Sequence, residues 1–185
     1  ATISKGSINT ATGNDSTAHS DNVINGGSGN DVLVLGTGAQ SNDTVKFDGN
    51  FGHDTIVNFD GNASSAGHDL LDFSAYFAGA FTVGSAAANG IAITDAAALG
   101  TKDADNNGSF SVSEVLAALD AAKVGTSEKG GSILYIVDGL EGGDAYHVFT
   151  AQVAADGTIS GAAEAGTIDL AGVTLGADDI AAYVA

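Results

Sequence analysis

The sequence contains no cysteine, methionine, proline or tryptophan. Without cysteine, the chain has no disulfides, no zinc thiolate site and no cysteine nucleophile. Lysine and arginine are scarce as well, with 5 of them against 23 acidic residues and a net charge of -18 at pH 7. This balance argues against nucleic acids and anionic membrane surfaces as partners, because their phosphates select basic patches.

Long apolar runs are also missing. No run approaches the roughly 20 apolar residues of a membrane helix, so we expect no transmembrane segment. The chain begins at Ala1 without a basic and then apolar leader, so we expect a processed or excised segment whose export is directed by another part of the chain. A hydrophobic content of 44% predicts folding. The negative charge opposes compaction unless cations neutralise it, and calcium is the obvious counter-ion.

Glycine, by contrast, is abundant, with 27 residues, and it marks the clearest motif. Residues 26–34, GGSGNDVLV, match G-G-x-G-x-D-x-U-x, a pattern typical of calcium-binding parallel β-helix turns. Glycines allow positive φ and turn carbonyls inward, an aspartate adds a hard oxygen, and the apolar run predicts a short strand. Residues 49–57 repeat the motif with only the second glycine replaced. The predicted calcium ligands are the carboxylates of Asp31 and Asp54 and the carbonyls of Gly27, Gly29 and Gly52.

Weaker echoes of the motif surround these two copies. Residues 67–73 form a third, degenerate one, and Gly13-Asn14-Asp15 repeats Gly29-Asn30-Asp31 near the start. Because the aspartates are unevenly spaced and one such turn cannot bury its own apolar face, we expect the irregular end of a β-roll.

A second metal motif occupies residues 103–114, DADNNGSFSVSE, which match the EF-hand pattern D-x-[DN]-x-[DN]-G-x5-E. In that pattern the glycine at the sixth position makes the sharp turn, and the glutamate at the twelfth is a bidentate ligand. Ser111 and Glu114 also form a capping box ahead of a helix predicted over residues 115–123, which Gly125 ends. The predicted calcium ligands are Asp103, Asp105, Asn107, the Ser109 carbonyl and Glu114.

Other segments are assigned by apolar pattern and turn residues. An alanine-rich stretch predicts a short helix near residues 94–99. Strands are expected near 80–84 and over 132–138, 144–153 and 167–170, the second and third of these joined as a hairpin, followed by a short helical or extended tail from 177.

With these motifs in place, residues 22–185 resemble the C-terminal region of repeats-in-toxin (RTX) proteins exported by type I secretion. The carriers are residues 26–33, the passages DTIVNF at 54–59 and HDLLDFS at 68–74, and the ending IDLAGV at 168–173 with DDI at 178–180. The resemblance implies a calcium-loaded β-roll, an uncleaved C-terminal secretion signal and an extracellular or cell-surface location. The chain departs from the family in having few intact repeats and an EF-hand-like insertion.

We therefore expect a mainly β fold: a calcium-binding parallel β-roll or β-solenoid-like domain with a short helical EF-hand-like insertion. The expected organisation is a leader or linker (1–20), an RTX-like β-roll (21–92), an EF-hand-like helix-loop-helix insertion (93–125) and a C-terminal β region with the type I secretion signal (126–185).

Catalytic motifs are missing. The four histidines show no H-E-x-x-H pairing, and neither a G-x-S-x-G elbow nor a Walker loop occurs. We expect a non-enzymatic domain of a secreted surface protein, such as an S-layer protein or an adhesin, that folds on binding calcium outside the cell. Its expected partners are calcium ions, the type I secretion machinery and cell-surface or self-assembly partners. Two alternatives remain open: the secretion domain of an RTX hydrolase such as a protease or lipase, and a complete small secreted ligand-binding protein.

Overall fold

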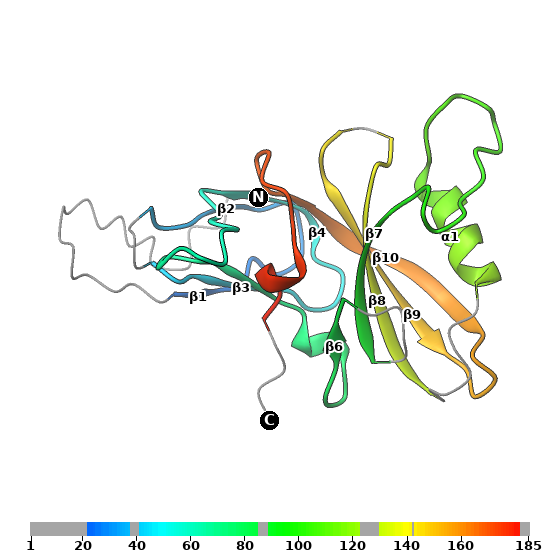
Figure 1. Ribbon diagram of the computed structural model, residues 1–185, viewed down its shortest axis with the longest axis horizontal. Helices are drawn as coiled ribbons and strands as arrows, with labels where there is room; N and C mark the ends of the chain where they lie inside the picture. Colours follow the sequence, from blue (N-terminus) through cyan, green and yellow to red (C-terminus); the bar gives the residue numbers. More distant parts are fainter. Residues whose placement is uncertain (1–21, 38–40, 85–88, 123–129, 142, 182–185) are drawn as a thin grey trace.

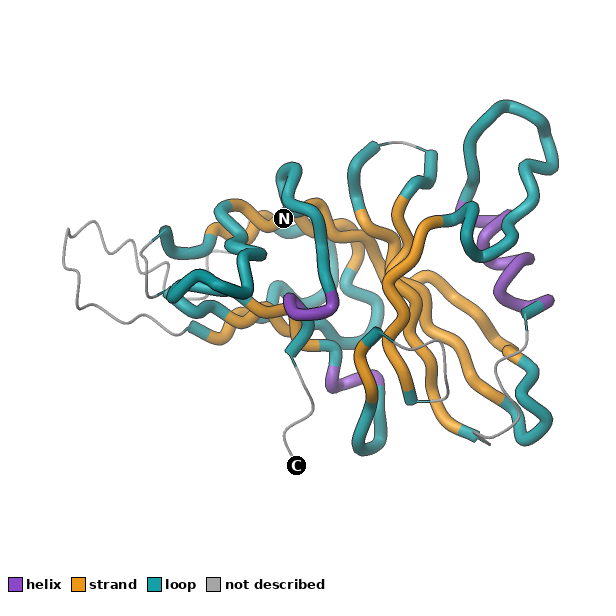
Figure 2. The backbone as a smooth tube through the Cα atoms, in the orientation of Figure 1, coloured by secondary structure: helices purple, strands orange, loops and turns teal. Residues whose placement is uncertain are grey.

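Most of the regular structure is β-strand. The computed structural model describes residues 22–37, 41–84, 89–122, 130–141 and 143–181 (Figure 1). In this part of the chain, strands far outweigh the single α-helix and two short 3-10 helices (Figure 2). The elements are β1 (Val23–Ile24), β2 (Val32–Val34), β3 (Thr44–Lys46), β4 (Gly52–Val57), β5 (Leu70–Asp72), η1 (Ser74–Tyr76), β6 (Thr82–Val83), β7 (Gly90–Asp95), α1 (Val112–Ala121), β8 (Gly131–Asp138), β9 (Tyr146–Val153), β10 (Ile159–Asp169) and η2 (Ala177–Asp179).

The first five strands alternate between two sheets. β1, β3 and β5 form a three-stranded parallel sheet, whereas β2 and β4 pair in parallel within a seven-stranded sheet. We use "coil" for one passage from a strand of the small sheet through the large sheet and back, and "stack" for the coils together. The side chains that face inward are apolar and fully or almost fully buried: Leu33, Val45, Ile56 and Leu71.

The large sheet continues from the stack into the C-terminal half of the chain. Its order is β2-β4-β10-β9-β8-β7-β6, with β10 parallel to β4 and antiparallel to β9. One hydrophobic core reaches from Leu33 to Ile180 and so includes residues from both halves. The glycine turns and the C-terminal strands therefore share one sheet and one core.

A second core lies under α1, on the opposite face of the large sheet. Val115 and Leu119 are fully buried there, in one cluster with Tyr135 and Phe149. The helix begins with the predicted capping box, because Ser111 Oγ accepts a hydrogen bond from the Glu114 N–H and the Glu114 carboxylate accepts one from the Ser111 N–H.

The C-terminal segment closes the other end of the small sheet. Ile180 bridges to Leu71 of β5, and the Ala181 N–H donates to the Leu71 carbonyl at 2.8 Å. Asp179 is buried and lies 2.8 Å from His68 Nε2. This segment, from η2 to Ala181, covers the free edge of β5.

The structure confirms the mainly β class, the β8–β9 hairpin and the helix after the acidic loop. The helix predicted near residues 94–99 is wrong. β7 extends through Asp95 in parallel register with β8, and turns follow it. The preference of alanine for a helix is weaker than the gain from pairing with β8, which buries Ile91 completely. The acidic loop thus follows a strand and turns, so the predicted helix-loop-helix is wrong at its first helix.

Other boundaries differ less. The strand predicted at 80–84 is limited to β6, and the one predicted at 167–170 is the end of the longer β10. The helix begins three residues earlier than expected. Three predictions lie outside the described residues: the leader or linker at 1–20, the helix stop at Gly125, and residues 182–185 of the expected secretion signal. Within those residues, the structure has no helix that is both long and apolar enough to cross a membrane.

Gly166 is where the stack meets the C-terminal strands. A β-carbon at this position would collide with the Gly52 carbonyl oxygen and with the Phe51 ring, both belonging to the stack. We predict that Gly166→Ala lowers the free energy of unfolding by about 2–3 kcal/mol, because the neighbouring coil would have to move. Gly79→Ala is the matched control, since a β-carbon there meets nothing within 4 Å. Urea denaturation measures both, and equal stabilities of the two variants would contradict the close approach.

Candidate metal sites

The first candidate site is the glycine turn that ends at Asp31. Gly27 and Gly29 have φ of 79° and 125°, values that a residue with a β-carbon rarely adopts. The Asp31 side chain is 1% exposed, and neither carboxylate oxygen has a hydrogen-bond partner among the described residues. Asp31 Oδ2 lies so near Gly26 that a β-carbon there would be 2.8 Å from it. The carboxylate therefore points into the glycine turn.

This arrangement is unfavourable without a ligand. A buried ionised carboxylate that has lost its hydration needs hydrogen bonds, a proton or a cation. The turn next to it is rich in backbone carbonyls, which together with a carboxylate are the oxygen donors that hard divalent cations prefer. The residues present thus fit a calcium ion, with Asp31, Gly27 and Gly29 as the predicted donors.

Asp54, the matching aspartate one coil later, has a different environment. Its Oδ1 accepts a hydrogen bond from the Asp31 N–H at 3.0 Å, and the residue is 2% exposed. Burial raises the pKa of Asp54 to about 6, and the Asp31 N–H offsets only part of that effect. Asp54 therefore supports the backbone of the coil before it, a role that the sequence motif did not suggest.

The same contact recurs on the small sheet. Asp43 Oδ1 accepts from the Asn22 N–H at 3.0 Å, and Asp69 Oδ1 accepts from the Asp43 N–H at 2.8 Å. Asp69 Oδ2 also accepts from the Asp60 N–H at 2.8 Å. Donor and acceptor are 21 and 26 residues apart here, and 23 for Asp31 and Asp54. We call these contacts the aspartate ladder: each carboxylate binds the preceding coil.

The predicted ligand Gly52 is also a contact between coils. It has a φ of 86°, and a β-carbon at this position would collide with the Gly29 carbonyl oxygen. Gly29 and Gly52 therefore lie in contact on adjacent coils, whereas the Gly52 carbonyl oxygen lies against Gly166 of β10. The structure brings Gly27, Gly29 and Asp31 into one turn and places Gly52 and Asp54 on the coil beside it.

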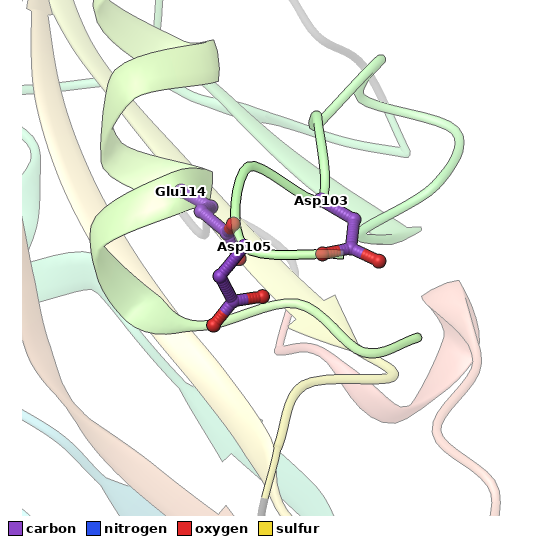
Figure 3. A group of neighbouring side chains, drawn as sticks. All are labelled: Asp103, Asp105 and Glu114. Atoms are coloured by element: carbon purple, nitrogen blue, oxygen red, sulfur yellow. The ribbon is translucent and has the colours of Figure 1, made fainter. Parts of the chain in front are cut away.

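The second candidate site is the loop before α1. The carboxylates of Asp103, Asp105 and Glu114 each place an oxygen within 4.8 Å of the others (Figure 3). Asp103 accepts from the N–H groups of Asn107 at 3.1 Å and Gly108 at 2.9 Å, which folds the loop around it. The N–H of Gly108 lowers the pKa of Asp103, whereas loss of hydration, followed by the neighbouring acids, raises that of Asp105.

Glu114 holds the two ends of this loop together. Its Oε2 accepts from the Ser111 N–H at 2.9 Å and its Oε1 accepts from the Ala104 N–H at 2.5 Å. These backbone donors lower the pKa of Glu114, so the carboxylate is ionised at neutral pH. A cation bound here would share this carboxylate with the backbone of the loop.

Asn107 and Ser109, the remaining predicted ligands, contact a residue that sequence reasoning missed. The Asn107 Nδ2 and the Ser109 Oγ donate to Glu141 Oε1, at 2.5 Å and 3.0 Å. Glu141 follows the isolated bridge between Phe110 and Leu140, which joins the loop to the β8–β9 connection. No spacing rule predicts this contact, because it depends on the pairing of two distant segments.

The histidines of the described residues contact separate partners. His53 lies 2.7 Å from Thr167 Oγ1, His68 contacts Asp179, and His147 lies 2.6 Å from Glu164 Oε1. A scan against models of protein families found no match, and searches of curated proteins and of solved structures found none either. The motifs and the geometry above are therefore the basis of any functional interpretation.

The buried aspartates predict a dependence of stability on pH. Burial raises the pKa of Asp69, like that of Asp54, from 3.8 to about 6. Between these values the folded state keeps a proton that the unfolded state releases, so stability is lost as pH rises through about 6. Without calcium, we predict that each group lowers the free energy of unfolding by at most about 3 kcal/mol between about pH 4 and pH 7.

Urea denaturation in calcium-free buffer across this pH range measures the effect. Asp69→Asn removes one titrating group and one of two accepted backbone hydrogen bonds. The variant should be less stable at low pH, but its stability should fall less steeply with rising pH. An unchanged slope would contradict the assignment to Asp69. Asp178→Asn, at an exposed carboxylate, is the control and should leave the slope as it is.

Proposed function

We propose that this chain is a non-catalytic, calcium-binding domain of the RTX type, which is exported by a type I system and folds on binding calcium outside the cell. The observation that carries the proposal is the Asp31 carboxylate. It is 1% exposed, has no hydrogen-bond partner among the described residues, and points into a glycine turn of the RTX pattern.

Calcium suits this turn better than magnesium does. Calcium accepts six to eight oxygen ligands in a flexible arrangement, including carbonyls, whereas magnesium demands a regular octahedron and keeps several waters. A turn whose available oxygen donors are backbone carbonyls and one buried carboxylate fits the flexible arrangement. The proposed donors are Asp31, Gly27 and Gly29. Of the other two predicted ligands, Asp54 accepts from the Asp31 N–H, and the Gly52 carbonyl oxygen lies against Gly166 of β10.

The arrangement of the strands supports a β-roll as the finer description of the stack. β1 to β5 alternate between the small parallel sheet and the parallel β2–β4 pair of the large sheet. Turns with positive-φ glycines lead from β1 to β2 and from β3 to β4, and each coil takes 21 to 26 residues between positions of the aspartate ladder. Parallel pairing without intervening helices needs turns that cross from one sheet to the other. The glycines supply the positive φ values for such turns.

The loop before α1 is the second proposed calcium site. Its ligands are Asp103, Asp105, Asn107, Ser109 and Glu114, at the motif positions 1, 3, 5, 7 and 12. Three of their carboxylates already converge. A cation would relieve the repulsion among them, which is part of what raises the pKa of Asp105.

Calcium binding would then control folding. An ion that binds only the folded state stabilises it by RT ln(1 + [Ca]/Kd), about 2.7 kcal/mol at about a hundredfold excess over Kd. Extracellular calcium modules bind at about 10⁻⁴–10⁻³ M, so such sites are empty in the cytosol and filled outside. With a net charge of -18, the chain needs such neutralisation to become compact.

A surface location completes the proposal. The ending at 168–173 and 178–180 resembles the C-terminal secretion region of RTX proteins, and the absence of cysteine leaves folding outside the cell independent of disulfides. An S-layer protein or adhesin is the proposed parent. The machinery of type I secretion is the proposed export partner.

We predict that Asp31→Asn loses one bound calcium ion and needs several times more calcium to fold, because the amide keeps the shape of the carboxylate and removes its charge. Glu114→Ala should lose a different ion and keep the one at Asp31. Asp178→Asn, at an exposed carboxylate, should bind the full complement. Circular dichroism during a calcium titration, together with the metal content of the dialysed protein, measures both quantities, with magnesium as the comparison.

The variants test the two proposed calcium sites separately. A full calcium count in Asp31→Asn would exclude the glycine turn, and a full count in Glu114→Ala would exclude the loop. A β-rich spectrum that is complete in chelator and unchanged by calcium would refute calcium-controlled folding even if ions were bound.

Export has its own test. We predict that a reporter protein fused ahead of residues 126–185 is released into the medium by cells that carry a type I system, and that the same fusion ending at Ala171 is retained. Immunoblots of medium and cells measure the distribution. Cells without the transporter are the control, and equal release of the shortened fusion would contradict a signal in the last segment.

A further inference from the structure

The two ends of the stack differ. At the C-terminal end, Ile180 covers the edge of β5, and β10 covers the edge of β4. At the other end, β1 and β2 are the outermost strands of their sheets among the described residues. An uncovered strand edge is a template for pairing with another strand unless charge, proline or a bulge protects it.

β2 has none of these protections. Its three residues are valine, leucine and valine, without charge, proline or a bulge in its pairing with β4. On the side of β4, the Leu35 N–H donates to the Val57 carbonyl and the Asp31 carbonyl accepts from the Thr55 N–H. Because backbone groups alternate in direction along a strand, those of Val32 and Val34 point away from β4.

The apolar surface of the described residues is concentrated at the same end. Their exposed large hydrophobic side chains are Val23 at 66%, Val32 at 53% and Val34 at 47%. Leu33, between the two valines of β2, faces the core. Both the backbone and the outer side chains of β2 are thus suited to pairing with another apolar strand.

Charge favours a second copy of this chain as the partner. Residues 22–37 contain one charged side chain, that of Asp31, and it is buried. Elsewhere, two molecules that each carry a net charge of -18 would repel each other. This end is where two copies can approach with little repulsion.

We propose that two copies pair through β2, antiparallel about a two-fold axis at Leu33. In this register Val32 of each copy lies opposite Val34 of the other, and each pair exchanges two backbone hydrogen bonds. The large sheet continues from one molecule into the next, and the exposed valines cover one another. The interface is isologous and closes at a dimer.

The calcium-loaded full chain should have a mass near twice 18.0 kDa by light scattering. Val32→Lys combined with Val34→Lys should raise the dimer dissociation constant about tenfold or more, because lysines on an edge strand oppose pairing. Thr82→Lys, on the exposed edge strand β6 at the opposite end of the large sheet, is the control and should remain dimeric. The proposal would be overturned if the parent chain were monomeric, or if the double variant, which we call the lysine pair, stayed dimeric.

Cysteine variants test the register, since the chain has no cysteine of its own. Opposite residues of a hydrogen-bonded antiparallel pair have Cα atoms about 5.5 Å apart, within the range that a disulfide spans. A mixture of Val32→Cys and Val34→Cys chains should therefore cross-link on oxidation, and neither variant alone should do so efficiently. Cross-linking of either variant alone at the rate of the mixture would refute the two-fold register at Leu33.

Calcium binding is measured on the same samples. A lysine pair that binds the full complement of calcium and is monomeric separates the dimer from the proposed calcium sites. Loss of calcium binding in the lysine pair would show damage to the glycine turn and would overturn the assignment of β2 as a surface strand.

Discussion

Buried carboxylates in the stack are the constraint on which the rest of the structure depends. Asp43, Asp54 and Asp69 each accept a hydrogen bond from the backbone of the coil before, and they do so where side chains have almost no contact with water. Such contacts hold coils at a fixed separation and leave room for glycine but not for a β-carbon, as at Gly52. The same burial makes each negative charge costly, which raises the pKa of Asp54 and Asp69.

Asp31 is the member of this series whose carboxylate has no such donor among the described residues. A cation in the glycine turn would replace the missing backbone donor with a stronger interaction, and the turn has the carbonyls to complete its coordination. The proposed ion would do for the carboxylate at the end of the stack what a backbone N–H does for the carboxylates inside it.

The C-terminal half of the chain provides a large surface against which the short stack packs. β10 continues the sheet beside β4, and Ile180 continues the small sheet beside β5. These contacts bury the apolar residues that a few isolated coils would leave exposed. The loop before α1 belongs to the other face of the sheet, with its own core, so the two proposed ions would act on different parts of the fold.

The sequence by itself determined the local features, because they depend on nearby residues. These features are the glycine turn at 26–31, the inward alternation through Leu33, the capping box of Ser111 and Glu114, and the β8–β9 hairpin. Tertiary structure alone decided the features that depend on distant pairing. Residues 90–95 form a strand because they pair with β8, although the alanines near residues 94–99 favoured a helix. β4 pairs with β10, which is distant in the sequence. The contrast between Asp31 and Asp54 also arises there: the two motifs differ only at the second glycine and at variable positions, and stacking decides which carboxylate receives a hydrogen bond.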